Sequence, residues 1–164
     1  MNSKDIALLL TQSLQAQGWK IRCVESCTAG ALTAAIGQIA GVSSVLDRSW
    51  VTYSNQAKME EVGVASSLLD AYGAVSQEVA EAMAVGAVLG CETDTLAVAV
   101  SGIAGPAGGS VDKPVGTIWL AIKAPHQVVS TRLLQLQGER TDIQQQAVAQ
   151  ALDFALDVTR SAAK

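Results

Sequence analysis

The chain has 164 residues, of which 49% are apolar and 16% are charged, and its net charge is −4. This length allows one domain with a sizeable core, and the lack of a lysine and arginine cluster argues against a general nucleic-acid binder. No apolar run reaches the roughly 20 residues that cross a membrane, and the N-terminal residues lack a signal-peptide pattern. We therefore expect a cytoplasmic protein with no membrane or nucleic-acid partner.

The predicted elements alternate between helix and strand along the chain. Apolar residues at helical spacing predict the first helix, and Gly18 ends it. A continuous apolar run over 95–101 indicates a central strand covered on both faces. The expected helices are 4–17, 28–39, 55–61, 65–72, 77–90 and a long final helix. The expected strands are 20–25, the second half of 45–54, 95–101, 117–124 and 127–136.

Two local signals refine the C-terminal part of this pattern. A turn at Pro125-His126 favours a hairpin of the last two strands. The segment Thr141-Asp142-Ile143-Gln144 fits a capping box at the start of the final helix. Because helices are available for both faces of a sheet, we expect a three-layer α/β/α sandwich with a mixed β-sheet, as a single domain over residues 1–164.

A hydroxyl and a thiol stand side by side in Glu25-Ser26-Cys27-Thr28-Ala29-Gly30, where a strand turns into a helix. Such a turn points a side chain toward the N-terminus of the next helix, where backbone N–H groups favour developing negative charge. A thiol in that position would have a lowered pKa, but no histidine pairs with Cys27 in the sequence, which favours a small buried residue that only fills space. These residues predict a nucleophile and leave Ser26 and Cys27 both open.

The single histidine, His126, is a poor candidate for the base that would activate this nucleophile, because its position is typical of a solvated turn residue. A neutral lysine can take a hydroxyl proton when burial or a nearby cation lowers its pKa. In the segment 52–58, a strand end and a helix start would bring Tyr53 and Lys58 together at one end of the sheet. The same spacing also fits a solvated lysine and a rim tyrosine, since most lysines are exposed.

Neither the cysteines nor the histidine predict a metal site or a disulfide framework. The cysteines are Cys23, Cys27 and Cys91, an odd number for a cytoplasmic chain. With one histidine, a Cys/His zinc site has too few ligands. We therefore expect no metal.

A glycine-rich loop over residues 101–110 follows the predicted central strand, where ligand loops collect in open α/β sheets. Its glycines allow backbone N–H groups to approach a phosphate or an oxyanion. The loop matches neither GxxxxGK[ST] nor GxGxxG. A tight structural loop is the alternative, and the loop sequence does not separate the two.

Five segments together resemble the C-terminal domain of competence/damage-inducible protein CinA. They are ESCTAG at 25–30, TYSNQAK at 52–58, GAVS at 73–76, SGIAGP at 101–106 and KPVGT at 113–117. The resemblance covers nearly the whole chain. The length is similar to that of the stand-alone, nicotinamide-nucleotide amidase type of the family, without the N-terminal domain of full-length CinA.

This resemblance implies hydrolysis of the carboxamide of nicotinamide mononucleotide, in pyridine nucleotide salvage, without a cofactor or a metal. It implies Ser26 as nucleophile, Lys58 as general base and Tyr53 as the group that orients or relays the proton. Backbone N–H groups near Cys27 and Thr28, or in the 101–109 loop, would form the oxyanion hole. The substrate-binding residues implied are Cys27, Thr28, Gly30, Ser101, Gly102, Gly105, Gly108, Gly109 and Arg140. A homodimer or larger homo-oligomer is also implied.

Two positions depart from the family pattern. The family usually has a glycine in place of Ala29, where the methyl group would tighten the ligand's approach, and often an arginine in place of Gln144. If that arginine holds phosphate, its loss costs about 1.5–3 kcal/mol of binding. Alternatively, Gln144 completes the capping box with Thr141. These departures motivate a second hypothesis, a non-catalytic or weakly active paralogue that binds a pyridine nucleotide.

Overall fold

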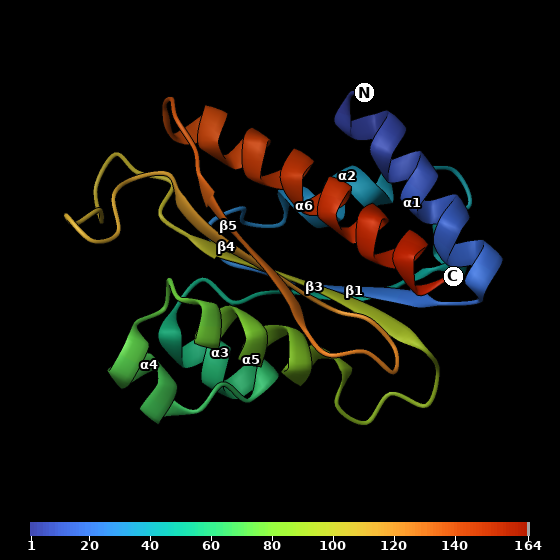
Figure 1. Cartoon of the computed structure of the whole chain (residues 1–164), viewed down its shortest axis with the longest axis horizontal. Helices are drawn as coiled ribbons and strands as arrows, with labels where there is room; N and C mark the ends of the chain where they lie inside the picture. The colour runs from blue at the N-terminus through green and yellow to red at the C-terminus, as the bar shows by residue number, and fades with distance from the viewer. Residues whose placement is uncertain (164) are drawn as a thin grey trace.

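A five-stranded mixed sheet lies between two layers of helices in the computed structural model of the chain, which describes residues 1–163 (Figure 1). The strands are β1 (Lys20–Glu25), β2 (Leu46–Val51), β3 (Thr95–Gly102), β4 (Thr117–Lys123) and β5 (Ser130–Gln135). The helices are α1 (Ser3–Gln17), α2 (Ala31–Gly37), α3 (Asn55–Val62), α4 (Ser66–Tyr72), α5 (Gln77–Val88) and α6 (Arg140–Ala162), with a 3₁₀ turn at Val42–Ser44. The predicted three-layer sandwich with a mixed sheet is confirmed.

The strand order is β2-β1-β3-β4-β5, with β1 parallel to β2 and β3, and β4 antiparallel to both of its neighbours. Glu25 at the end of β1 pairs with Val51 on one side and with Val100 on the other. The carboxyl ends of the three parallel strands therefore meet at one edge of the sheet, which is where ligands bind in open α/β folds.

The two helix layers bury different kinds of surface. Helices α1, α2 and α6 cover one face, above the sheet in Figure 1, with leucine and isoleucine side chains. Helices α3, α4 and α5 cover the other face, where alanines of α5 pack against alanines of the sheet. A Cβ built on Gly86 of α5 would lie 1.8 Å from the carbonyl oxygen of Val62, so only glycine lets α3 and α5 approach this closely.

Some helix boundaries in the structure differ from the predicted ones, because local contacts determine where a helix begins. Helix α2 begins at Ala31 rather than at residue 28, since 26–30 form a separate turn. The predicted capping box of Thr141 and Gln144 is wrong. The capping box of α6 instead pairs Glu139 with Asp142, and the Glu139 backbone N–H donates to Asp142 Oδ2 over 2.9 Å. Helix α6 thus begins at Arg140, which leaves Gln144 free for another role.

Candidate active site

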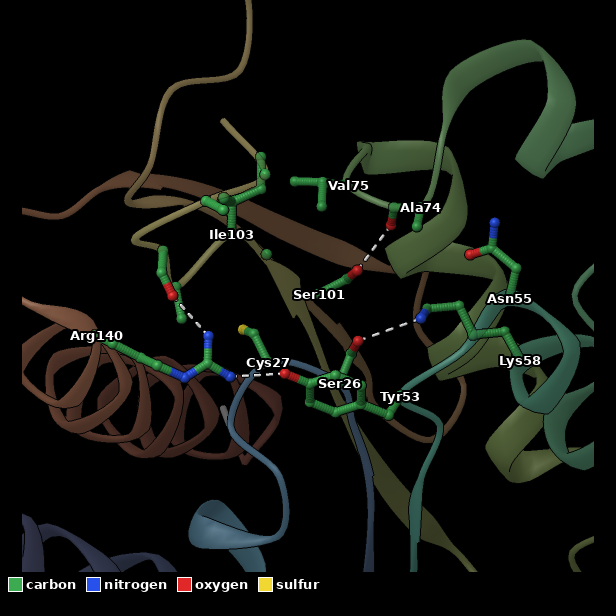
Figure 2. A pocket seen from close by; sticks show the side chains of 15 residues that line it. Ser26, Cys27, Tyr53, Asn55, Lys58, Ala74, Val75, Ser101, Ile103 and Arg140 are labelled. Carbon is green, nitrogen blue, oxygen red and sulfur yellow. Dashed lines mark hydrogen bonds between the residues drawn. The ribbon is translucent and has the colours of Figure 1, made fainter. Parts of the chain in front are cut away.

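A cavity of about 240 Å³ opens at the edge of the sheet where β1, β2 and β3 end (Figure 2). The side chains that line it come from segments far apart in the sequence, including the turn after β1, the start of α3 and the start of α6. The lining residues are Ser26, Cys27, Tyr53, Asn55, Lys58, Ala74, Val75, Ser101, Gly102, Ile103, Ala104, Gly105, Ala107, Gly108 and Arg140.

Ser26 and Lys58 face each other inside this cavity. Lys58 Nζ lies 3.2 Å from Ser26 Oγ, and it donates to the carbonyl oxygen of Thr52 over 2.9 Å. Both side chains are buried, and Lys58 is only 1% exposed. Ser54 caps the start of α3 by accepting from the Ala57 N–H, which sets the helix direction that turns Lys58 back to the sheet. The alternative of a solvated lysine is wrong.

Burial makes the neutral form of Lys58 easier to reach than that of an exposed lysine. Desolvation lowers the pKa of the Lys58 ammonium from 10.5, an effect that Cys27 partly offsets. A neutral lysine amine has two N–H bonds and one lone pair. With one N–H bound to the Thr52 carbonyl, the lone pair is available to accept the Ser26 proton.

Cys27 lines the cavity beside Ser26 but is a poor thiolate. Burial raises the pKa of the Cys27 thiol to about 11, and the nearby charges of Lys58 and Arg140 offset only part of that increase. The expectation that a helix N-terminus lowers this pKa is therefore wrong. Of the two candidates for nucleophile, the geometry favours the hydroxyl.

The N-terminus of α2 is already filled by the carboxylate of Glu25. Its two oxygens accept hydrogen bonds from the Thr28 hydroxyl and the Gly30 N–H at 2.7 and 3.0 Å, and from the Leu32 N–H at 3.1 Å. The N–H and hydroxyl of Thr33 add bonds of 2.8 and 2.6 Å. Thr28 and Gly30 consequently lie outside the cavity lining and hold the turn instead, which corrects the expectation that this helix end faces the reacting group.

Glu25 also connects Ser26 to Lys58 through its main chain. The Thr52 N–H donates to the Glu25 carbonyl oxygen over 2.7 Å, and the Thr52 carbonyl in turn accepts from Lys58 Nζ. Glu25 is fully buried, and Ser26 is the next residue. A continuous hydrogen-bonded chain therefore fixes where Ser26 and Lys58 meet.

Tyr53 and Arg140 form the outer rim of the cavity. Arg140 Nη2 donates to the Tyr53 hydroxyl oxygen, and Nη1 donates to the carbonyl oxygen of Gly105, each over 2.7 Å (Figure 2). The Tyr53 side chain is 55% exposed. The structure thus brings Arg140 into the site as the resemblance implied, and it places the tyrosine hydroxyl against a cation.

The glycine-rich loop serves packing at some positions and the cavity at others. A Cβ on Gly102 would lie 2.2 Å from Ile118 Cδ1, and one on Gly109 would lie 2.8 Å from the Val115 nitrogen. Gly108 lines the cavity at φ 93°, a left-handed conformation that suits glycine. Gly109 lies outside the lining, whereas Ser101, Gly102, Gly105 and Gly108 belong to it.

Neither departure from the family pattern lines the cavity. Ala29 is exposed on the turn and has a left-handed φ of 51°. Its methyl group therefore strains the backbone and does not narrow the path of the ligand. Gln144 Nε2 donates to the Cys27 carbonyl oxygen over 2.8 Å. Gln144 therefore ties α6 to the turn that carries Ser26.

Some lining residues were given no role from the sequence. They are Asn55, Ala74, Val75, Ile103, Ala104 and Ala107. Asn55, Ala74 and Val75 lie inside segments that carried the resemblance, but small, apolar or amide side chains have no spacing that marks them as functional. His126, by contrast, is an exposed turn residue that contacts Asp94 at the opposite end of the sheet and lies outside the cavity lining, so the prediction of a solvated turn residue is confirmed.

The profile of the CinA C-terminal domain family matches residues 3–159. The nicotinamide-nucleotide amidohydrolase PncC of Enterobacter agglomerans is 45% identical over 93% of this chain and 92% of its own length. The protein of the same name from Escherichia coli K12 is 44% identical over 86% of this chain and 85% of its own length.

Two crystal structures share the fold over nearly their full length. Competence/damage inducible protein CihA from Agrobacterium tumefaciens is 39% identical with a TM-score of 0.90, and the match covers 96% of both chains. A CinA superfamily protein from Klebsiella pneumoniae is 30% identical with a TM-score of 0.92, covering 98% of this chain and 99% of that one. This chain therefore belongs to the CinA C-terminal domain family.

Proposed function

We propose that this protein is an amidohydrolase that converts nicotinamide mononucleotide to nicotinate mononucleotide and ammonia, with Ser26 as nucleophile and Lys58 as general base. The observation that carries the proposal is the 3.2 Å approach of the buried Lys58 amine to Ser26 Oγ inside a cavity. The substrate is suggested by the two relatives named nicotinamide-nucleotide amidohydrolase, which are 44–45% identical to this chain.

The charge of the cavity suits a substrate that carries a phosphate. Among the residues that the structure describes, the lining includes the basic side chains Lys58 and Arg140 and no carboxylate. Since the Lys58 amine is directed at Ser26, Arg140 at the rim is the cation available to an anionic group. Arginine can hold a phosphate with two parallel hydrogen bonds.

The first half-reaction forms an acyl-enzyme. Ser26 Oγ attacks the carboxamide carbon while Lys58 Nζ takes the hydroxyl proton, which gives a tetrahedral oxyanion and a lysine ammonium. When the carbon–nitrogen bond breaks, the Lys58 ammonium returns a proton to the departing nitrogen. Ammonia leaves, and Ser26 carries the nicotinoyl group as an ester.

The second half-reaction reverses these roles with water as the nucleophile. Lys58 takes a proton from the water as its oxygen attacks the ester carbon, and the bond from that carbon to Ser26 Oγ then breaks. The proton held by Lys58 returns to Ser26 Oγ, and the carboxylic acid loses its remaining proton to solvent as the carboxylate is released. Lys58 ends neutral, so the site is ready for another cycle.

Ammonia release from nicotinamide mononucleotide by the purified protein tests this function. We expect turnover in the wild-type protein and its loss in Ser26→Ala, with Ser66→Ala, an exposed serine on α4, as the matched control. Cys27→Ala should keep its activity. Ammonia release that persists in Ser26→Ala would overturn the serine mechanism, and full loss in Cys27→Ala would point to the thiol instead.

The non-catalytic alternative predicts a different result in the same assay. A protein that only binds the nucleotide would gain thermal stability from it without releasing ammonia. Both departures that motivated this alternative, Ala29 and Gln144, lie outside the cavity lining. Steady ammonia release would rule it out.

A further inference from the structure

Ser101 carries a buried hydroxyl that lines the cavity. The proton of this hydroxyl already forms a hydrogen bond. Ser101 Oγ lies 2.7 Å from the carbonyl oxygen of Ala74 (Figure 2). A carbonyl oxygen can only accept a hydrogen bond, so the Ser101 hydroxyl must be the donor. The side chain is 1% exposed and lines the cavity. Ser101 Oγ can therefore offer a ligand nothing but its lone pairs.

The sheet register places this acceptor beside the nucleophile. Glu25 pairs with Val100 across the parallel strands β1 and β3, and Ser26 and Ser101 are the next residues on each chain. Neighbouring strands lie about 4.8 Å apart. Figure 2 shows the Ser101 side chain near that of Ser26, with the lysine amine next to Ser26, and all three line the cavity.

The basic and phenolic side chains around Ser26 are able to donate, and the Asn55 amide can both donate and accept. The rim cation Arg140 donates to Tyr53, which leaves the proton of that hydroxyl free to point elsewhere. Lys58 presents an amine at Ser26. Ser101 Oγ is thus an acceptor that the sheet register places next to Ser26, in a cavity whose described lining holds no carboxylate.

Of the groups that could occupy the reacting position, a primary carboxamide matches this arrangement best. Its oxygen can face donors while its NH₂ group supplies the proton that an acceptor requires. An ester has no proton to give at that position. A carboxylate would place an oxygen against the lone pairs of Ser101 Oγ, which is repulsive.

We propose that Ser101 is a specificity-determining residue, which accepts a hydrogen bond from the NH₂ group of the scissile carboxamide and selects amides over esters and acids. This inference rests on the proposed amidohydrolase function. The contact also holds the nitrogen that departs near Lys58, which must protonate it. Once the carboxylate has formed, the same oxygen favours release of the product.

The test compares two substrates, nicotinamide mononucleotide and the methyl ester of nicotinate mononucleotide. In Ser101→Ala, kcat/KM for the amide should fall by about tenfold or more, while kcat/KM for the ester stays the same or rises. Inhibition by nicotinate mononucleotide should become tighter. Ser101→Thr keeps the hydroxyl and should restore the preference for the amide.

Equal losses for amide and ester in Ser101→Ala, with unchanged product inhibition, would show that Ser101 acts only on structure and would overturn the inference. If the alanine variant does not fold, Ser101→Cys provides the same comparison, because a thiol is a weak acceptor. Absence of ammonia release in the wild-type protein would instead overturn the proposed function, and this inference with it.

Discussion

Arg140 donates a hydrogen bond from Nη2 to the Tyr53 hydroxyl oxygen over 2.7 Å, which joins the start of α6 to the segment between β2 and α3. Its other terminal nitrogen holds the Gly105 carbonyl, so one guanidinium spans three parts of the cavity rim. A substrate anion that reaches this guanidinium would compete with these contacts. Binding of an anion to Arg140 would therefore be linked to the position of Tyr53.

Replacing Arg140 by glutamine should raise KM for nicotinamide mononucleotide by about tenfold or more, because a charge-assisted hydrogen bond contributes about 1.5–3 kcal/mol. The riboside, which lacks phosphate, should lose much less in kcat/KM. Steady-state kinetics on both substrates measure this, with Arg160→Gln at the exposed C-terminal end of α6 as control. Equal losses on both substrates would mean that Arg140 serves only to hold the rim.

Replacing Lys58 by methionine should lower kcat by about 10²–10⁴, the usual contribution of a general base. In the wild-type protein, activity should rise with pH as the Lys58 ammonium loses its proton. Since burial lowers the pKa of Lys58 from 10.5, this rise should come at lower pH than for an exposed lysine. A pH–rate profile measures it. A profile without a rising limb below pH 10.5 would contradict the assignment of Lys58 as base.

The same substitution should remove the pH dependence of stability that Lys58 confers. Folding depresses the pKa of Lys58, so the unfolded chain binds more protons between the folded pKa and 10.5, and stability falls as pH drops through that window. Lys58→Met removes this linkage but leaves the buried Thr52 carbonyl without its donor, so the linkage predicts how the stability difference between the two proteins changes with pH. Thermal unfolding at neutral and alkaline pH checks this, and the melting temperature of the variant relative to the wild-type protein should fall toward alkaline pH.

Glu25→Gln should destabilise the protein and slow the chemistry at Ser26. The amide replaces an acceptor oxygen with an NH₂ group that must face N–H and hydroxyl donors, and each buried donor left unpaired costs about 1–3 kcal/mol. Denaturant unfolding and the rate of Ser26 labelling by a serine-reactive fluorophosphonate measure the two effects. The exposed Glu61→Gln on α3 is the matched control, and equal behaviour of both variants would contradict the positioning role.

Ala29→Gly should stabilise the protein by up to about 1 kcal/mol, because a left-handed φ of 51° strains alanine but not glycine. Activity should stay near the wild-type level, since Ala29 lies outside the cavity lining. The comparison variant Ala34→Gly, within α2, should be destabilised by about 1 kcal/mol. A change in KM for Ala29→Gly would place this residue nearer the substrate than the structure does.

The sequence by itself determined the layers of this fold and the elements that meet at the site. Hydrophobic periodicity reports which face of an element is buried, so the apolar run of β3 and the alternation in β1 predicted a mixed sheet covered by helices. Strand ends followed by polar residues then indicated where Ser26 and Lys58 lie. The family motifs supplied the roles for these residues.

Only the tertiary structure decided which partner each polar side chain takes. The N-terminus of α2 looked free in the sequence, yet Glu25 fills it, because the strand brings its own last side chain to the helix end. Because α6 begins at Arg140, Gln144 is not part of the capping box, and its side chain donates to the Cys27 carbonyl instead. Burial of Lys58 and the engaged proton of Ser101 likewise depend on contacts between distant segments, which periodicity does not encode.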